Sequence, residues 1–207
     1  MADWIDRQLR RRGISDERVL AAMRRIPRER FVPPAQRAHA HDDAALPLAH
    51  GQTISQPYVV ALTCELLALD GSERVLDVGT GSGYAAAVLA ELAASVVTIE
   101  RIPELARGAS AALRDAGHPE VEVIVGDGSL GVPARAPFGG IAVAAASPEV
   151  PPALWAQLAT GGRIVLPLGD EHEQHLVALE RTAGGPRYHG STTVRFVPLV
   201  GGEGPGR

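Results

Sequence analysis

The chain has 207 residues, of which 45% are hydrophobic and 4% aromatic, and its formal net charge is −4 at pH 7. This length suits one domain with a buried core, and the apolar fraction is too high for a disordered chain. The negative charge gives no general attraction to nucleic acid or to acidic membrane surfaces. Cys64 is the only cysteine, so no internal disulfide can form. We therefore expect a cytoplasmic protein, since no secretory signal or spanning apolar run is recognisable.

Residues 1–35 are predicted to form two short helices. Ser15 is the expected N-cap of the second, whose apolar residues Val19, Met23 and Ile26 recur at helical spacing before Pro27 ends it. Residues 36–56 show no strong period and are predicted to be a long loop. Long loops inside compact proteins are often functional.

From Pro57 the pattern changes to helices that alternate with strands. A helix from Pro57 to Gly71 comes first, and helices at 84–93, 103–117 and 151–160 then separate five strands. These strands are expected at 74–78, 95–100, 121–126, 141–146 and 163–169, followed by two antiparallel additions at 175–181 and 192–197. Single helices between strands imply right-handed parallel crossovers. We predict an α/β fold with a doubly wound, mostly parallel seven-stranded sheet, Rossmann-like, under an N-terminal helical cap.

A glycine-rich turn is expected between the first strand and the next helix. It comprises Asp77, Gly79, Thr80, Gly81, Ser82 and Gly83. Glycines at alternate positions allow a sharp turn and close ligand approach, and the following helix offers free N–H groups. Tyr84 stands where a dinucleotide fingerprint has its third glycine. The motif instead resembles motif I of class I S-adenosylmethionine-dependent methyltransferases.

Two further features lie at the ends of the next strands. Glu100 can accept hydrogen bonds from a ribose diol, and Asp127 can accept from an adenine amino group beside Gly128, which leaves room for the ring. Singly, Glu100 could be a surface acid and Asp127-Gly128 an ordinary turn. Together they meet at the edge where open α/β sheets bind ligands, and we therefore predict a cofactor site there.

The stretch Gly51-Gln52-Thr53-Ile54-Ser55-Gln56-Pro57 resembles the protein-L-isoaspartate O-methyltransferase family. Supporting segments are 27–33, 45–48, 147–151 and 195–199, and the resemblance extends from about residue 18 to about residue 200. The first motif is specific to that family, whereas the glycine turn is specific only to the superfamily.

The resemblance implies methyl esterification of the α-carboxylate of L-isoaspartyl residues in damaged proteins and peptides. S-Adenosyl-L-methionine would be the cofactor and S-adenosyl-L-homocysteine the product. The ester would then cyclise to a succinimide, which starts repair. Ser55 matches the family's active-site hydroxyl, and Gln52, Thr53, Ile54 and His50 are expected to bind substrate. Without the resemblance, Ser55 would be interpreted as a residue that satisfies a helix N-terminus.

Three positions depart from the family pattern: Gly139 replaces an aspartate, Ala144 a threonine and Ala49 a glycine. These changes leave open a related carboxyl O-methyltransferase that acts on an aspartate of one dedicated peptide or on a small carboxylic acid. A nicotinamide-dependent oxidoreductase and a non-catalytic cofactor-binding module are further alternatives. The histidine pairs lack the spacing of H-E-x-x-H, and no metal site is expected.

We expect one methyltransferase domain over residues 1–207, acting as a monomer. Residues 1–56 would hold the N-terminal helices and substrate loop, residues 57–200 the cofactor-binding core, and residues 201–207 a frayed tail.

Overall fold

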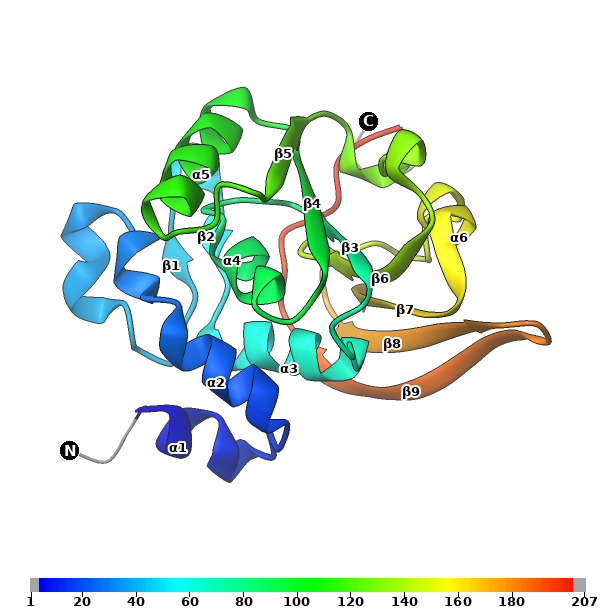
Figure 1. The fold of residues 1–207 in the computed structure, drawn as a ribbon, viewed down its shortest axis with the longest axis horizontal. Coiled ribbons are helices and arrows are strands. Elements are labelled where there is room, and N and C mark those ends of the chain that lie inside the picture. Colours follow the sequence, from blue (N-terminus) through cyan, green and yellow to red (C-terminus); the bar gives the residue numbers. More distant parts are fainter. Residues whose placement is uncertain (1–3, 203–207) are drawn as a thin grey trace.

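The computed structural model describes residues 4–202 and contains a seven-stranded sheet covered by helices on both faces (Figure 1). In spatial order the strands are β5 (Glu122–Val125), β4 (Ser95–Glu100), β3 (Arg74–Val78), β6 (Phe138–Val143), β7 (Leu158–Gly169), β8 (Gln174–Thr182) and β9 (Gly185–Val194). The first five are parallel, and β8 and β9 are added antiparallel. The predicted fold class is confirmed.

Each face of the sheet carries its own apolar core. Along β3, Val75 packs into one core, whereas Leu76 and Val78 pack into the other, because successive side chains of a strand point to opposite faces. The first core includes α3 (Pro57–Leu67), α4 (Tyr84–Ala90) and α5 (Pro103–Asp115). The second includes Leu154 of α6 (Pro152–Gln157).

The N-terminal helices extend the first core. α1 (Trp4–Gln8) and α2 (Glu17–Arg25) bury Ile5, Leu20 and Met23, and α2 packs against α3 and α4. Asp16, and not Ser15, caps α2: its carboxylate accepts from the backbone N–H of Arg18 at 2.8 Å. The Ser15 hydroxyl donates to Glu65 instead. The predicted cap was therefore wrong by one residue.

Residues 36–56 contain only short regular pieces. They include 3-10 helices at Pro34–His39 and Ala49–Gly51, and the two-stranded sheet of β1 (Leu46–Pro47) and β2 (Thr53–Ile54). In this sheet Leu46 pairs with Ile54, which is buried in the first core. Pairing and burial thus hold this segment at the edge of the large sheet.

Three strands differ from their predicted positions by three residues or more, and α3, α4 and α6 end earlier than predicted. The 141–146 strand is β6 at Phe138–Val143, β7 begins at Leu158, and the 192–197 strand is β9 at Gly185–Val194. Of the predicted tail, 203–207 lies outside the described residues, whereas Gly201 and Gly202 contact Asp127 and Ser129. Within residues 4–202, no helix is long and apolar enough to cross a membrane.

Candidate active site

A cleft of about 910 Å³ opens where the parallel strands end. One wall is formed by residues 51–56 and the start of α3, and the opposite wall by residues 192–200. The floor comes from the turns after β3, β4, β5 and β6, and includes Gly79, Glu100, Gly128 and Ala144. The cleft therefore lies at the edge where open α/β sheets bind their ligands.

The glycine-rich turn leaves open space toward this cleft. Gly79, Thr80, Gly81 and Ser82 line it. Gly81 has a φ of +53°, and a Cβ there would meet no atom closer than 3.8 Å. Gly83 faces the other way, where a Cβ would lie 3.3 Å from the Ala109 side chain. Gly81 thus provides a cradle for a ligand, whereas Gly83 lets α4 pack closely on α5.

Glu100 closes the glycine turn from the neighbouring strand. Its Oε2 atom accepts from the Gly81 N–H at 2.9 Å, and its Oε1 atom accepts from the Ile102 N–H at 3.0 Å. The residue is 6% exposed and lines the cleft. Because each carboxylate oxygen has a further lone pair, Glu100 can still accept from ligand hydroxyls.

Asp77 lies beneath the turn and does not line the cleft. It is fully buried, and its Oδ2 atom accepts from the Thr98 hydroxyl at 2.8 Å. The Thr98 oxygen is 2.6 Å from the Thr80 hydroxyl, so Thr80 donates to it. A chain of hydrogen bonds thus runs from Asp77 through the Thr98 hydroxyl to the hydroxyl of Thr80, which lines the cleft.

Asp127 contacts the end of the described chain. Its Oδ1 atom accepts from the backbone N–H and hydroxyl of Ser129, and its Oδ2 atom accepts from the Gly202 N–H at 2.7 Å. Burial raises the pKa of Asp127 and these hydrogen bonds lower it, with a net lowering. At Gly128, a Cβ would come within 2.6 Å of Val78, so close packing against β3 also requires glycine.

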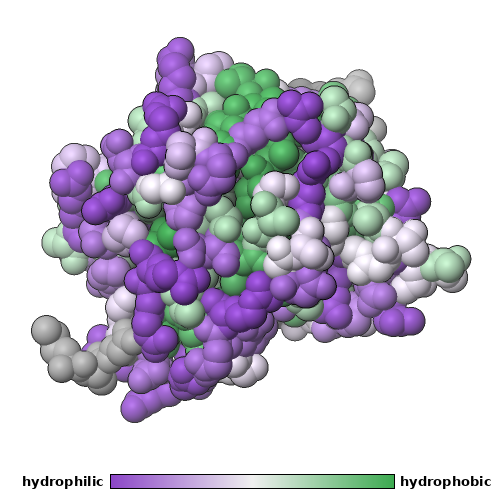
Figure 2. All heavy atoms as spheres, in the orientation of Figure 1, coloured by the Kyte–Doolittle hydropathy of each residue, from purple (hydrophilic) through white to green (hydrophobic). Residues whose placement is uncertain are grey.

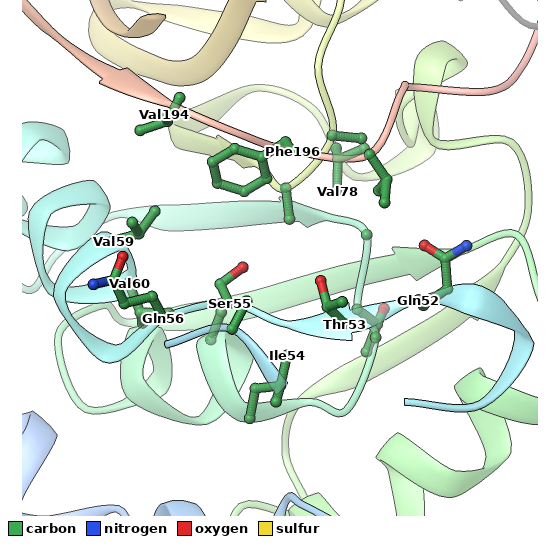
Figure 3. Close-up of a pocket in the computed structure, with 18 of the residues that line it drawn as sticks. Gln52, Thr53, Ile54, Ser55, Gln56, Val59, Val60, Val78, Val194 and Phe196 are labelled. Carbon is green, nitrogen blue, oxygen red and sulfur yellow. The ribbon is translucent and has the colours of Figure 1, made fainter. Parts of the chain in front are cut away.

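From Thr53 to Ser55 the side chains alternate between the cleft and the core (Figure 3). Figure 3 shows the Ser55 and Thr53 oxygens directed toward the side on which Phe196 lies, and Ile54 directed away. Ile54 is 3% exposed, and its burial fixes this alternation. Gln52 also lines the cleft, whereas His50 is exposed and is not among the lining residues.

The opposite wall was missed as a site by sequence reasoning. Val194, Phe196 and the residues up to Val200 line the cleft (Figure 3). Hydrogen bonds on both sides of Ala146 hold this segment: Ala146 N–H donates to Val197, and Leu199 N–H donates to Ala146. The segment 195–199 was part of the family resemblance, which was the one signal available.

Arg12 and Tyr58 also line the cleft and were not predicted. The Arg12 guanidinium carbon lies 3.5 Å from the centre of the Tyr58 ring, and the same side chain pairs with Asp43 at 2.7 Å. This contact joins the N-terminal region to the start of α3 at the mouth of the cleft.

Two of the residues that depart from the family pattern, Ala144 and Gly139, have different surroundings. Ala144 lines the cleft, and its side chain is 3.4 Å from the position of a Cβ on Gly79. Gly139 instead lies against the Glu73 side chain, where a Cβ would come within 2.6 Å. Among the described residues, no group of three histidine, cysteine or acidic side chains could hold a metal ion.

Comparisons with known proteins agree on one family. The family model described as protein-L-isoaspartate(D-aspartate) O-methyltransferase matches residues 3–204. A protein-L-isoaspartate O-methyltransferase of Herpetosiphon aurantiacus is 50% identical over 200 residues, 97% of this chain and 89% of that protein. Protein-L-isoaspartate O-methyltransferase 2 of Marinobacter nauticus is 56% identical over 199 residues, 95% of this chain and 91% of that protein.

Solved structures show the same likeness. A protein-L-isoaspartate O-methyltransferase matches with a TM-score of 0.83 at 29% identity, over 98% of this chain and 67% of that one. A putative enzyme of the same kind from Plasmodium falciparum, in complex with S-adenosyl-L-homocysteine, has a similar fold with a TM-score of 0.80 at 24% identity, over 95% of this chain and 96% of that one.

Proposed function

The chain belongs to the protein-L-isoaspartate O-methyltransferase family, and on that premise we propose that it methylates the α-carboxylate of L-isoaspartyl residues in damaged proteins and peptides. The products are a methyl ester and S-adenosyl-L-homocysteine. The ester then cyclises to a succinimide, whose hydrolysis returns some normal aspartate. One observation carries the proposal: the Ser55 hydroxyl faces a cleft whose floor is the glycine turn closed by Glu100.

The residues around the glycine turn fit S-adenosyl-L-methionine. Gly81 has room for a ligand, and Glu100 retains acceptor capacity toward the cleft. We assign direct cofactor contacts to Gly79, Thr80, Gly81, Ser82, Glu100 and Gly128, which line the cleft. Asp77 and Gly83 would support the turn from behind, and Asp127 would accept from the adenine amino group.

When bound, S-adenosyl-L-methionine supplies an electrophilic methyl group on a sulfonium. The acceptor carboxylate is already ionised at neutral pH, so no residue has to act as a general base. Ser55 donates a hydrogen bond that orients this carboxylate for in-line attack.

The substrate is held between the two walls of the cleft. Gln52 and Thr53 line it beside Ser55, and buried Ile54 anchors the backbone between them. His50 is exposed at the end of this segment and is proposed to contact only the outer part of a peptide. Phe196 and Val194 cover the opposite side and exclude water from the reacting groups.

Replacement of Ser55 by alanine tests this role. Loss of one hydrogen bond to a charged group costs about 1.5–3 kcal/mol, so Ser55→Ala should lower kcat roughly ten- to a hundredfold. The dissociation constant for S-adenosyl-L-homocysteine, measured by calorimetry, should stay within a factor of about two. Ser110→Ala, in α5 and outside the cleft lining, serves as the control. An unchanged kcat in Ser55→Ala would remove Ser55 from the active site.

We further propose that residues 1–207 form one cytoplasmic methyltransferase domain that works as a monomer and binds no nucleic acid. Residues 1–56 would provide one wall of the acceptor site, and residues 57–200 the cofactor side and the opposite wall. The net charge of −4 supports the absence of a nucleic-acid partner. Sedimentation velocity should show one species of about 21.7 kDa, and a stable dimer would contradict the monomer.

A further inference from the structure

Arg28 is a charged residue buried completely, with 0% of its surface exposed. It lies on the 3-10 helix Arg28–Arg30, directly after α2. Its guanidinium donates to three backbone carbonyls: Nη1 to Ala40, and Nη2 to Ser55 at 2.9 Å and to Ala44 at 3.4 Å. One arginine therefore links the N-terminal region to both ends of residues 36–56, which are here called the substrate loop.

The need to fill space in the core does not explain why the buried side chain at position 28 is a charged one. Burial lowers the pKa of Arg28, which reflects the cost of removing its charge from water. An apolar side chain of similar volume would fill the same space without that cost. The carbonyls that it binds belong to a segment with few regular backbone hydrogen bonds, and buried carbonyls need donors. The planar fork of arginine supplies several donors at once.

The same guanidinium also lies near the cofactor side of the cleft. Its central carbon is 5.6 Å from the ring centre of Tyr84, the first residue of α4 after the glycine turn. Tyr84 is 1% exposed and rigidly packed. Arg28 thus fixes the Ser55 backbone relative to the helix that begins at the proposed cofactor site.

We propose that Arg28 is a positioning residue for methyl transfer, which holds the Ser55 carbonyl so that the Ser55 hydroxyl is directed into the cleft. The proposal rests on the function proposed above, because Arg28 acts through Ser55. Displacement of an orienting group by about 1 Å can cost roughly a hundredfold in rate. Loss of the Arg28 fork should therefore affect kcat rather than cofactor binding.

A double-mutant cycle tests this coupling. Arg28→Lys keeps the charge but replaces the fork by a single ammonium, and should lower kcat about tenfold or more with cofactor affinity unchanged. The double variant Arg28→Lys/Ser55→Ala should be no slower than Ser55→Ala, because the group through which Arg28 acts is already gone. Multiplicative losses in the double variant would overturn the proposal.

Arg18→Lys is the matched control. Arg18 is on α2 and also donates to two backbone carbonyls, those of Leu69 at 2.5 Å and Leu92 at 3.0 Å, neither of which belongs to the substrate loop. Arg18→Lys should show any loss of thermal stability that Arg28→Lys shows, but its kcat should stay near that of the wild type. An equal loss of kcat in Arg18→Lys would assign the effect to general loosening and overturn the proposal.

Two outcomes separate this proposal from the one on which it rests. An unchanged kcat in Ser55→Ala would overturn both roles. A reduced kcat in Ser55→Ala, combined with independent losses in the cycle, would overturn only the role of Arg28. If Arg28→Lys does not fold, Arg28→Gln keeps a planar donor without charge, and the cycle with Ser55→Ala is expected to show the same absence of further loss.

Discussion

Asp77 is an acidic residue placed where its ionised form is disfavoured. Burial, together with the nearby charge of Glu100, raises the pKa of Asp77 to about 7, although the hydrogen bond from Thr98 lowers it in part. Its Oδ1 atom has no partner among the described residues. In the unfolded chain the same carboxyl ionises near its ordinary pKa of about 3.9. Between these two values the folded protein binds more protons, so its stability falls as pH rises.

This linkage predicts how Asp77→Asn changes stability with pH. The variant cannot ionise, so it should gain stability relative to wild type as pH rises from about 4 to 7, and the gain should then level off. The free energy of unfolding can rise relative to wild type by at most about 1.4 kcal/mol for each pH unit. Urea denaturation at pH 5, 6, 7 and 8 measures the difference. Parallel pH dependence in the two proteins would show that Asp77 does not titrate abnormally.

At the residue scale, the sequence predicted where the site lies better than it predicted the direction in which each side chain points. Gly81, Glu100 and Ser55 line the cleft where the motifs placed them. Asp77 and Gly83 sit in the same motif but face the protein interior. Orientation depends on which face each side chain takes and on neighbours such as Ala109, and these are distant in sequence.

At the element scale, the C-terminal segment is the main difference from expectation. Residues 201–207 were predicted to fray, yet the Gly202 N–H donates to Asp127 and Leu199 is 5% exposed. A cofactor whose amino group uses Asp127 has to share or replace the Gly202 hydrogen bond. We therefore expect the Gly202 N–H and the adenine amino group to compete for Asp127.

Gly202→Pro removes this N–H and tests the competition. The dissociation constant for S-adenosyl-L-methionine should fall about three- to tenfold, since one net hydrogen bond contributes on the order of 1 kcal/mol. Gly184→Pro is the control, because it removes a 3.2 Å bond from the Gly184 N–H to Thr182 in the β8–β9 turn. Weaker binding in Gly202→Pro would show instead that the segment supports the cofactor.

Element boundaries were predicted correctly for β3 and β4 and for helix starts that local chemistry decides. Pro57 and Pro103 begin α3 and α5 as expected, because proline suits the first helical turn. The strand expected at 192–197 instead ends at Val194 as part of β9, which pairs with β8 from Gly185 onward. That register depends on the partner strand, and no single segment encodes it.

At the scale of the whole molecule, the fold class could be predicted because the alternation of strands and helices leaves few topologies. Parallel crossovers of one hand place β3 beside β4 and β6, and bring the ends of these strands to one edge. The wall formed by residues 192–200 could not be predicted in this way. It returns across that edge from the far side of the sheet, through contacts with Ala146.

The molecular surface adds one apolar area away from the cleft. Val125 is 54% and Leu130 45% exposed, at and just after the edge strand β5. Figure 2 shows apolar side chains gathered around β5 in the same view. Neither Val125 nor Leu130 is among the residues that line the cleft.

The most direct test of the proposed reaction is methyl transfer from labelled S-adenosyl-L-methionine to two peptides of the same sequence, one with L-isoaspartate and one with normal aspartate. Base-labile label should appear on the isoaspartyl peptide alone, because the α-carboxylate is free only in that linkage. Label on both peptides, or on neither while the cofactor binds, would contradict the proposed function.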